Sequence, residues 1–304
     1  MIKNFDEVLE IARKRGPKKV ALACAEDVDA LKAINEAKKN GIVEAILVGD
    51  EEKIKANAKA ESIDIAQYEI VHEGDMVQAS RKAVELVSTG KAHMVMKGLV
   101  DTSIILKAVL DKEIGLRTGN PLSHVALFQV PGFDKMHLVT DAAMTIAPDL
   151  EGKKALINNV VPVANALDIA MPKVAVICAK EKANPKMPDT MDAQALQEMN
   201  EKGEIKDCIV GGPFALDNAV SKKAAEIKGI DHPVAGDADI LLTGDIEAGN
   251  VLYKSMIYFG QAKNAGVIVG AKAPIVLTSR ADSDEAKLYS IALGVLCAAE
   301  FFDK

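Results

Sequence analysis

The sequence predicts an α/β protein with parallel-rich sheets flanked by helices, and three observations support this prediction. Strand-like and helix-like segments alternate through residues 4–96, the pattern of parallel strands connected by helices. Aromatic residues make up only 4% of the chain and tryptophan is absent, so small and aliphatic side chains must fill the core, as in sheets covered by helices. A length of 304 residues is near the upper size of a single core, which favours two domains of about 150 residues each.

The first part of the chain alternates between helix and strand. Residues 4–15 have apolar side chains at helical spacing, and Gly16-Pro17 ends this pattern. Short apolar runs then predict strands, each followed by a helical pattern. The expected helices are 4–15, 27–40, one that begins at 51, and 76–88, and the expected strands are 19–25, 44–48, 68–71 and 93–96.

The middle of the chain differs, because the strands 123–130 and 135–140 are separated by only four residues, which predicts an antiparallel pair. Alternation then resumes, and 211–217 is expected to be a loop that leads into a helix at Asn218. The later expected helices are 152–170, 192–202, 250–260 and 282–302, and the strands are 173–179, 208–210, 238–242, 267–270 and 274–277. The last helix should have one apolar face, formed by Leu288, Ile291, Ala292, Val295 and Leu296.

Two strand segments are similar to each other. Residues 19–25 read KVALACA and residues 173–179 read KVAVICA, and each follows a helix and a proline. The similarity predicts either two related halves or a convergence of two apolar strands, and the sequence supports the two interpretations equally.

Charge and composition exclude several classes of protein. Lys and Arg number 37 against 44 Asp and Glu, so the net charge is −7 and a basic nucleic-acid interface is disfavoured. The four cysteines have no C-x-x-C spacing and the five histidines have no metal-ligand spacing, which argues against a zinc ribbon, a disulfide framework or a metal site. Cys24, Cys178 and Cys297 are expected to be inert core thiols. No apolar run approaches about 18 residues and no signal peptide is recognisable, so we expect a cytoplasmic protein with no membrane partner.

Polar segments that follow strands are the candidates for chemistry, because ligands of parallel sheets bind where strand carboxyl ends meet helix amino ends. Three such segments are rich in Gly, Ser and Thr: 97–103, 243–250 and 278–285. None matches a P-loop or a G-x-G-x-x-G fingerprint, which disfavours an ATPase or an ordinary Rossmann dehydrogenase. Lys97 and Arg117 are each interpreted as an anion contact or as a solvated surface side chain.

The segment 278–285 allows two interpretations. Arg280 could bind a phosphate, Ser279 could donate a hydrogen bond to an oxyanion, and a carboxylate could accept a proton. Alternatively, Asp282 and Glu285 form a capping box that begins the last helix.

Several sequence motifs, taken in order along the chain, resemble those of the phosphate acetyl/butyryltransferase family, and their residues are more similar to its butyryl branch. The motifs are Lys97-Gly-Leu-Val-Asp-Thr102, 106–119, Ser123-His-Val125, 139–143, Gly211-Gly-Pro-Phe-Ala-Leu-Asp217, 239–245, 248–254 and Thr278-Ser-Arg280. The resemblance implies reversible acyl transfer between coenzyme A and inorganic phosphate without a metal or redox cofactor, and a homo-oligomer. It also implies a fold similar to isocitrate and isopropylmalate dehydrogenases, with the active site in a cleft between domains 1–134 plus 272–304 and 135–271.

The resemblance also assigns roles to individual residues. Ser279 would steady the oxyanion, Arg280 would bind the anionic substrate, and a carboxylate would deprotonate the coenzyme A thiol. The position of the acetyl branch's catalytic Asp is Ala286 here, which leaves Asp282, Asp284 and Glu285 as candidates; we favour Asp284 and Glu285, because Asp282 should cap the helix. The predicted substrate-binding residues are Lys97, Gly98, Thr102, Lys107, Arg117, Asp245, Gly249, Asn250, Lys254 and Thr278.

Two other functions compete with this one. A metal- and NAD-dependent decarboxylating dehydrogenase of the same fold would need an Asp cluster and three substrate-binding arginines, and neither is visible in the sequence. A non-catalytic acyl-CoA-binding homologue would be expected to lack Ser279 or Arg280, and both are present.

Overall fold

The computed structural model describes residues 1–278 and 282–302, which form two compact units. The terminal unit comprises residues 5–120 and 265–304, and the central unit comprises residues 1–4 and 121–264. In both units the chain is α/β, as the sequence predicts. The domain boundaries 134/135 and 271/272 remain a prediction. The chain passes from one compact unit to the other after residues 120 and 264, which is earlier than each predicted boundary.

The terminal unit contains a sheet in the order β3-β2-β1-β4-β11-β10. Strands β1 to β4 and β11 run parallel, and β10 is antiparallel to β11. Its strands are β1 (Lys18–Ala23), β2 (Val43–Gly49), β3 (Glu69–His72), β4 (Met94–Lys97), β10 (Lys263–Val269) and β11 (Ile275–Val276). Its helices are α1 (Phe5–Arg15), α2 (Val28–Lys39), α3 (Glu51–Ala60), α4 (Met76–Ser88), α5 (Thr102–Val109) and α11 (Asp284–Phe302), with a 3₁₀ turn at Ile65–Gln67.

Three helices of this unit begin at an aspartate that directly follows a strand or turn. The carboxylates of Asp27, Asp50 and Asp75 accept backbone N–H groups in the first turns of α2, α3 and α4. Such caps satisfy donors that a helix start leaves open, so the sequence itself marks where each helix begins.

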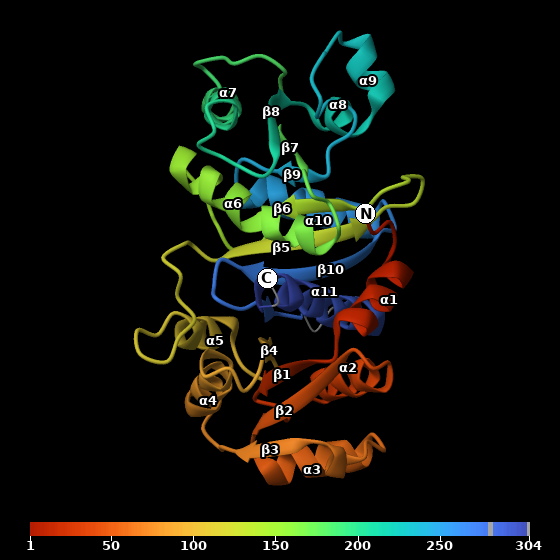
Figure 1. Ribbon diagram of the computed structural model, residues 1–304, viewed down its shortest axis with the longest axis vertical. Coiled ribbons are helices and arrows are strands. Elements are labelled where there is room, and N and C mark those ends of the chain that lie inside the picture. The colour runs from red at the N-terminus through yellow and green to blue at the C-terminus, as the bar shows by residue number, and fades with distance from the viewer. Residues whose placement is uncertain (279–281, 303–304) are drawn as a thin grey trace. The chain divides into compact units, whose positions relative to one another are not determined.

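Helix α11 is buried on nearly all sides, which corrects the prediction of a single apolar face. It packs against α1 and α2 (Figure 1). The rings of Phe5, on α1, and Tyr289, on α11, stack with centroids 4.2 Å apart. Gly294 faces the sheet so closely that a Cβ there would lie 2.8 Å from Val276 and 2.9 Å from the sulfur of Met94. The last helix is therefore a core element of the terminal unit.

The central unit contains a sheet in the order β5-β6-β9-β7-β8, and its first two strands are antiparallel, as predicted. The remaining neighbours are parallel. Its strands are β5 (Ser123–Gln129), β6 (His137–Thr140), β7 (Lys173–Ile177), β8 (Ile209–Phe214) and β9 (Ile240–Leu242). Its helices are α6 (Leu150–Ala166), α7 (Pro188–Glu201), α8 (Leu216–Val220), α9 (Lys222–Ile227) and α10 (Ile246–Tyr258), and α8 and α9 lie beside each other (Figure 1).

Strand β8 extends further than the sequence predicts, because the expected loop 211–217 is strand as far as Phe214. β8 is the last strand in the order of this sheet, so Pro213 removes no hydrogen bond that a second neighbour would need. The register with β7 shifts between Ala175 and Ile177, which accommodates the proline.

None of the helices in the described ranges is long and apolar enough to cross a bilayer.

Candidate active site

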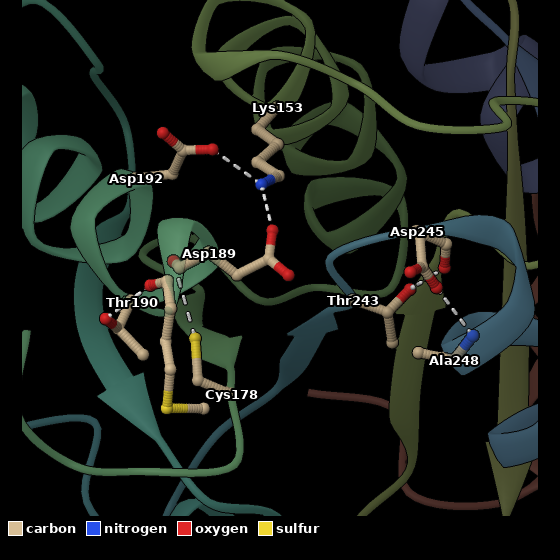
Figure 2. A network of polar contacts seen from close by, with 9 residues as sticks. Lys153, Cys178, Asp189, Thr190, Asp192, Thr243, Asp245 and Ala248 are labelled. Carbon is tan, nitrogen blue, oxygen red and sulfur yellow. Dashed lines mark hydrogen bonds and ion pairs between the residues drawn. The ribbon is translucent and has the colours of Figure 1, made fainter. Parts of the chain in front are cut away.

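In the central unit, the loop after β9 leads into α10 and carries the predicted substrate-binding residues Asp245 and Gly249. Asp245 begins the helix: its Oδ1 accepts a hydrogen bond from the Ala248 N–H at 2.7 Å (Figure 2). Gly249 is buried, and a Cβ there would lie 2.3 Å from the carbonyl oxygen of Asp141. Both residues therefore shape this loop, and α10 approaches Asp141 closely because residue 249 has no side chain.

Asn250 and Lys254, two further predicted substrate-binding residues, are exposed on α10. The Asn250 side-chain amide donates to the carbonyl of Ala142 at 3.2 Å. The Lys254 ammonium lies 5.1 Å from the centre of the Tyr253 ring and forms no ion pair within the described part of the chain. Its positive charge is therefore available to an anion.

Asp141 organises the loop that follows β6, although the sequence analysis did not select it as a site residue. Its side chain is 2% exposed and accepts the N–H groups of His124, Ala143 and Met144 at 3.0, 2.8 and 3.0 Å. A carboxylate with so many donors fixes the backbone that surrounds it. The available signal was an Asp directly after a strand, which is typical of an Asx turn.

A second network, also not predicted, lies near the carboxyl ends of β7 and β9 (Figure 2). The ammonium of Lys153, on α6, donates to carboxylate oxygens of Asp189 and Asp192, on α7, at 2.7 Å each. Burial alone would lower the pKa of Lys153, but these hydrogen bonds outweigh burial and raise the pKa. Lys153 is thus a buried cation that fixes the start of α7.

Asp189 connects this network to the loop after β9. A Cβ on Gly244 would lie 3.0 Å from the Asp189 carboxyl carbon, so the carboxylate packs directly over that loop. The thiol of Cys178, just beyond β7, donates to the Asp189 carbonyl at 3.5 Å (Figure 2). The loops after two neighbouring strands are therefore held together through Asp189.

In the terminal unit, Lys97 and Gly98 lie where β4 ends beside β1, the strand at which the order of the sheet reverses. The Gly98 N–H donates to the carbonyl of Ala23 at 2.8 Å, and a Cβ at Gly98 would lie 2.3 Å from the carbonyl oxygen of Cys24. The Lys97 ammonium donates to the carbonyls of Gly98 and Val100 at 3.1 and 3.0 Å. Lys97 thus stabilises its own loop, and its contact with substrate remains a prediction.

Four more predicted substrate-binding residues lie in the same unit. Thr102 and Lys107 are exposed at the first and last turns of α5. Arg117 is exposed and its backbone forms an isolated bridge with Ala271, and Thr278 is half-buried. No hydrogen bond or ion pair connects any two of these four side chains in the residues that the structure describes.

Ser279 and Arg280 lie outside the described residues, so the prediction of their roles rests on the sequence alone. Asp284 and Glu285 lie in the first turn of α11, as predicted, and both are exposed. The N-cap predicted at Asp282 is wrong by one residue, because the hydroxyl of Ser283 accepts the Ala286 N–H at 3.1 Å. Asp282 can therefore not be set aside as a base on the ground that it caps the helix.

Lys287 lies one turn into α11 and is 4% exposed. Its ammonium is 3.5 Å from Asp29 Oδ2, on α2, and 3.8 Å from Asp284 Oδ1. It therefore joins the starts of two helices, and one of its partners is a candidate base.

The cysteine thiols are held in the protonated form. Burial raises the pKa of Cys24 and Cys178 to about 11 and that of Cys208 and Cys297 to about 12. Cys178 is half-buried rather than part of the core, which corrects the sequence prediction for that residue. Among residues 1–278 and 282–302, no group of three or more His, Cys, Asp or Glu side chains is placed to hold a metal ion.

Comparison with known proteins gives consistent similarities over the whole chain. The family model described as phosphate acetyl/butaryl transferase matches residues 4–80 and 73–295. A phosphate butyryltransferase of Clostridium acetobutylicum is 52% identical, and the match covers 98% of this chain and 99% of that protein. A phosphate acetyltransferase of Thermotoga maritima is 45% identical, with 97% and 99% covered.

Solved structures agree with these sequence matches. The crystal structure of a branched-chain phosphotransacylase from Enterococcus faecalis V583 is similar with a TM-score of 0.82 and 35% identity, covering 92% of this chain and 99% of that one. A 4-hydroxythreonine-4-phosphate dehydrogenase from Klebsiella pneumoniae is similar with a TM-score of 0.61 at 10% identity, covering 93% and 98%. The second similarity concerns the fold alone, and it agrees with the predicted dehydrogenase-like architecture.

Proposed function

The chain belongs to the phosphate acetyl/butaryl transferase family and is a phosphate acyltransferase, and we propose that it moves butyryl or a similar short acyl group between coenzyme A and inorganic phosphate. The observation that carries the choice of acyl group is the full-length identity, which is 52% and 51% with two phosphate butyryltransferases and 45% with a phosphate acetyltransferase. The dehydrogenase alternative is not favoured, since its support is a similarity of fold at 10% identity.

The proposed reaction exchanges a thioester for an acyl phosphate in one displacement. The thiolate sulfur of coenzyme A attacks the carbonyl carbon of the acyl phosphate, the carbon–oxygen bond to phosphate breaks, and phosphate leaves with the electron pair. A free thiol with a pKa near 8.5 is mostly protonated at neutral pH, so a carboxylate that accepts its proton accelerates the step. In this scheme Ser279 donates a hydrogen bond to the oxyanion and Arg280 binds the phosphate.

Three carboxylates remain candidates for the base. Asp284 is 82% exposed, and its only carboxylate–ammonium distance among the described residues is the long one of 3.8 Å to Lys287. Exposure lets a carboxylate exchange protons with water after each turnover. Glu285 is exposed beside it, and Asp282 joins them now that Ser283 provides the cap.

The remaining parts of the proposal concern the conditions under which the enzyme works. The exchange involves no change of oxidation state, so we propose that acyl-CoA and phosphate react without a redox or metal cofactor. We further propose a cytoplasmic homo-oligomer that acts on small molecules and requires neither nucleic acid nor membrane.

The test is phosphate-dependent release of coenzyme A, measured with a thiol reagent for acetyl-, butyryl- and isobutyryl-CoA. We expect kcat/KM to be highest for a four-carbon acyl group and release to need phosphate. One methylene changes transition-state binding by about 1–3 kcal/mol, so the expected preference over acetyl is tenfold or more for two methylenes. A higher kcat/KM for acetyl-CoA would contradict the proposed acyl group, and phosphate-independent release would contradict the reaction.

Arg280→Ala should lower kcat/KM by far more than threefold, because it removes a guanidinium that pairs with the phosphate. Ser279→Ala should lower kcat more than it changes KM. An Arg280→Ala enzyme within threefold of wild type, about 0.7 kcal/mol, would show that Arg280 is peripheral.

A further inference from the structure

The loop that follows β6 is held by one buried carboxylate, that of Asp141. Besides three backbone N–H groups, its oxygens accept the N–H and the hydroxyl of Thr145 at 3.3 and 3.1 Å. Five donors fill the lone-pair sites of a carboxylate, which number about four. The Asp141 side chain therefore acts on the backbone around it and has no capacity left for a substrate.

The backbone that Asp141 fixes is joined to the loop after β9. The Thr243 N–H donates to the carbonyl of Thr140 at 3.0 Å, and the Ile246 N–H donates to the carbonyl of Ile146 at 2.9 Å. The first acceptor precedes Asp141 in the chain and the second follows it. The two loops are therefore connected on both sides of this residue.

Two side chains of the second loop complete the connection. Thr243 is buried, and its hydroxyl lies 3.3 Å from the carbonyl oxygen of Asp141 and 3.4 Å from that of Asp245, so it can donate to either (Figure 2). The Asn250 side-chain amide donates to the carbonyl of Ala142. Residues 141 and 142 thus present the carbonyl groups that orient Thr243 and Asn250, and the Asp141 carboxylate holds both carbonyls in place.

Asn250 keeps polar groups for a ligand. One of its amide hydrogens is used by Ala142, whereas the other hydrogen and Oδ1 have no partner in the described part of the chain. Asn250 and Lys254 are four residues apart on α10, so they share an exposed face of that helix. A hydrogen-bond donor beside a cation suits a phosphate group, which inorganic phosphate, acyl phosphate and coenzyme A all carry.

We propose that Asp141 is a positioning residue for acyl transfer: it holds the carbonyl groups that orient Thr243 and Asn250, and so presents this face of α10 to the phosphate group of a substrate. The inference rests on the proposed function, which supplies the phosphate-bearing substrates. A loop that is fixed before binding avoids an ordering cost when the substrate arrives. Without the Asp141 carboxylate, that cost weakens substrate binding.

A merely structural role for Asp141 would give a different kinetic result. If loss of the carboxylate only unfolds part of the enzyme population, the active fraction falls, which lowers kcat and leaves KM unchanged. If the loss loosens the two loops of a folded enzyme, the ordering cost is met on binding, which raises KM and leaves kcat nearly unchanged. The division of the effect between KM and kcat therefore separates the two roles.

The test is Asp141→Asn, which keeps the shape of the side chain but replaces one acceptor oxygen by an NH₂ group that faces donors. We expect KM for phosphate or for butyryl-CoA to rise about tenfold or more, with kcat within about twofold of wild type. Thr243→Val leaves the Asp141 carboxylate in place, so it provides the same readout if Asp141→Asn does not fold. It should raise the same KM about threefold, and Thr243→Ser, which keeps the hydroxyl, should fall between Thr243→Val and wild type.

The matched control is Asp149→Asn. This variant removes a carboxylate from the same connection between β6 and α6, and it keeps the cap of α6 because Asn caps as well as Asp. It should leave both KM values unchanged. A lower kcat at unchanged KM in Asp141→Asn, wild-type kinetics in that variant, or an equal rise of KM in Asp149→Asn would overturn the inference.

Hydrogen exchange of the free enzyme tests the connection of the loops without turnover. Asp141→Asn should accelerate exchange over residues 243–250 as well as 141–146, and Asp149→Asn should not accelerate exchange over 243–250. Unchanged exchange over 243–250 in Asp141→Asn would overturn the inference. Absence of phosphate-dependent transfer in wild type would instead overturn the proposed function.

Discussion

Among the described residues, each unit buries one lysine close to the loops at the carboxyl ends of its strands, and the two lysines are paired differently. In the central unit, the Lys153 side chain is 3% exposed and lies 2.7 Å from each of two aspartate oxygens. In the terminal unit, the Lys287 side chain is 5% exposed, but its aspartate oxygens are 3.5 and 3.8 Å away. Similar burial thus accompanies tight hydrogen bonding in one unit and loose ion pairing in the other.

The difference suggests a division of roles between the two units. Short charge-assisted hydrogen bonds fix the start of α7, so Asp189 is held over the loop 243–250 before a substrate arrives. The longer pairs of Lys287 hold Asp29 and Asp284 less tightly, and Asp284 is a candidate base. The central unit therefore fixes its paired carboxylates by short hydrogen bonds, and the terminal unit leaves a candidate base loosely paired.

The largest difference that we expect between the two units is the acid sensitivity of the central unit, which contains the buried His137. Burial, together with the charge of Lys135, lowers the pKa of His137 to about 4, whereas an unfolded histidine titrates near 6.5. Above pH 6.5 both states are neutral; between pH 6.5 and 4 only the unfolded chain takes up the proton, so stability falls as the pH falls.

For this residue we expect a loss of about 2 kcal/mol between pH 7 and pH 5, and about 3 kcal/mol at most. Urea unfolding at a series of pH values measures it. His137→Phe should remove this part of the pH dependence, since it keeps the burial and removes the titration. His72→Gln, at an exposed histidine of the terminal unit, is the control. An unchanged pH profile for His137→Phe would show that another group causes the acid sensitivity.

The second effect concerns the tight pair. Lys153→Met should lower the free energy of unfolding by about 2 kcal/mol, because two charge-assisted hydrogen bonds are lost. Part of this loss is offset, because the variant no longer buries an ammonium group and because water can solvate the partly exposed aspartates. Chemical denaturation measures the change. The neighbouring Lys154, with partners at 3.7 and 3.9 Å, is the matched control, and Lys154→Met should cost less than about 0.5 kcal/mol. Equal losses for the two variants would remove the distinction between tight and loose pairing.

The Lys153 network is a set of contacts that could not be predicted from the sequence. The partners of Lys153 are 36 and 39 residues away along the chain, and no local pattern distinguishes this lysine from those on the surface. Helix starts, in contrast, were readable from local signals, because Asp27, Asp50 and Asp75 cap the helices beside them. Contacts within a few residues were predictable, and contacts that depend on how α6 meets α7 were not.

The errors in predicted elements have the same origin. Gly-Gly-Pro in 211–213 is typical of a loop, and only its place in the edge strand β8 permits it to be a strand. The periodicity of α11 indicated one apolar face, whereas α1, α2 and the sheet cover several faces. For the candidate site, the Gly, Ser and Thr content of segments 97–103 and 243–250 marked the loops that contain Gly98 and Gly249, and the contact of these glycines with substrate stays a prediction. Asp141 was not selected, because its role depends on the backbone N–H groups that surround it.

The smallest effect that we expect is that of Lys287→Met. The variant removes a buried charge whose partners are too distant for good hydrogen bonds and open enough for water to solvate them, so the desolvation that it relieves should nearly balance the attraction that it removes. We therefore expect the free energy of unfolding to change by less than about 1 kcal/mol in either direction.

Double-mutant cycles test most directly whether the Lys153 pair is stronger than the Lys287 pair, since they separate the pair interaction from the burial cost of each partner. The cycle of Lys153→Met with Asp189→Asn should give a coupling energy above about 1 kcal/mol, and the cycle of Lys287→Met with Asp29→Asn one below about 0.5 kcal/mol. Both are measured by denaturant unfolding at pH 7 and low salt, where screening is weakest. A coupling of Lys287 with Asp29 as large as that of Lys153 with Asp189 would mean that the longer distances do not weaken the pair, and the terminal unit would then hold its loops as firmly as the central one.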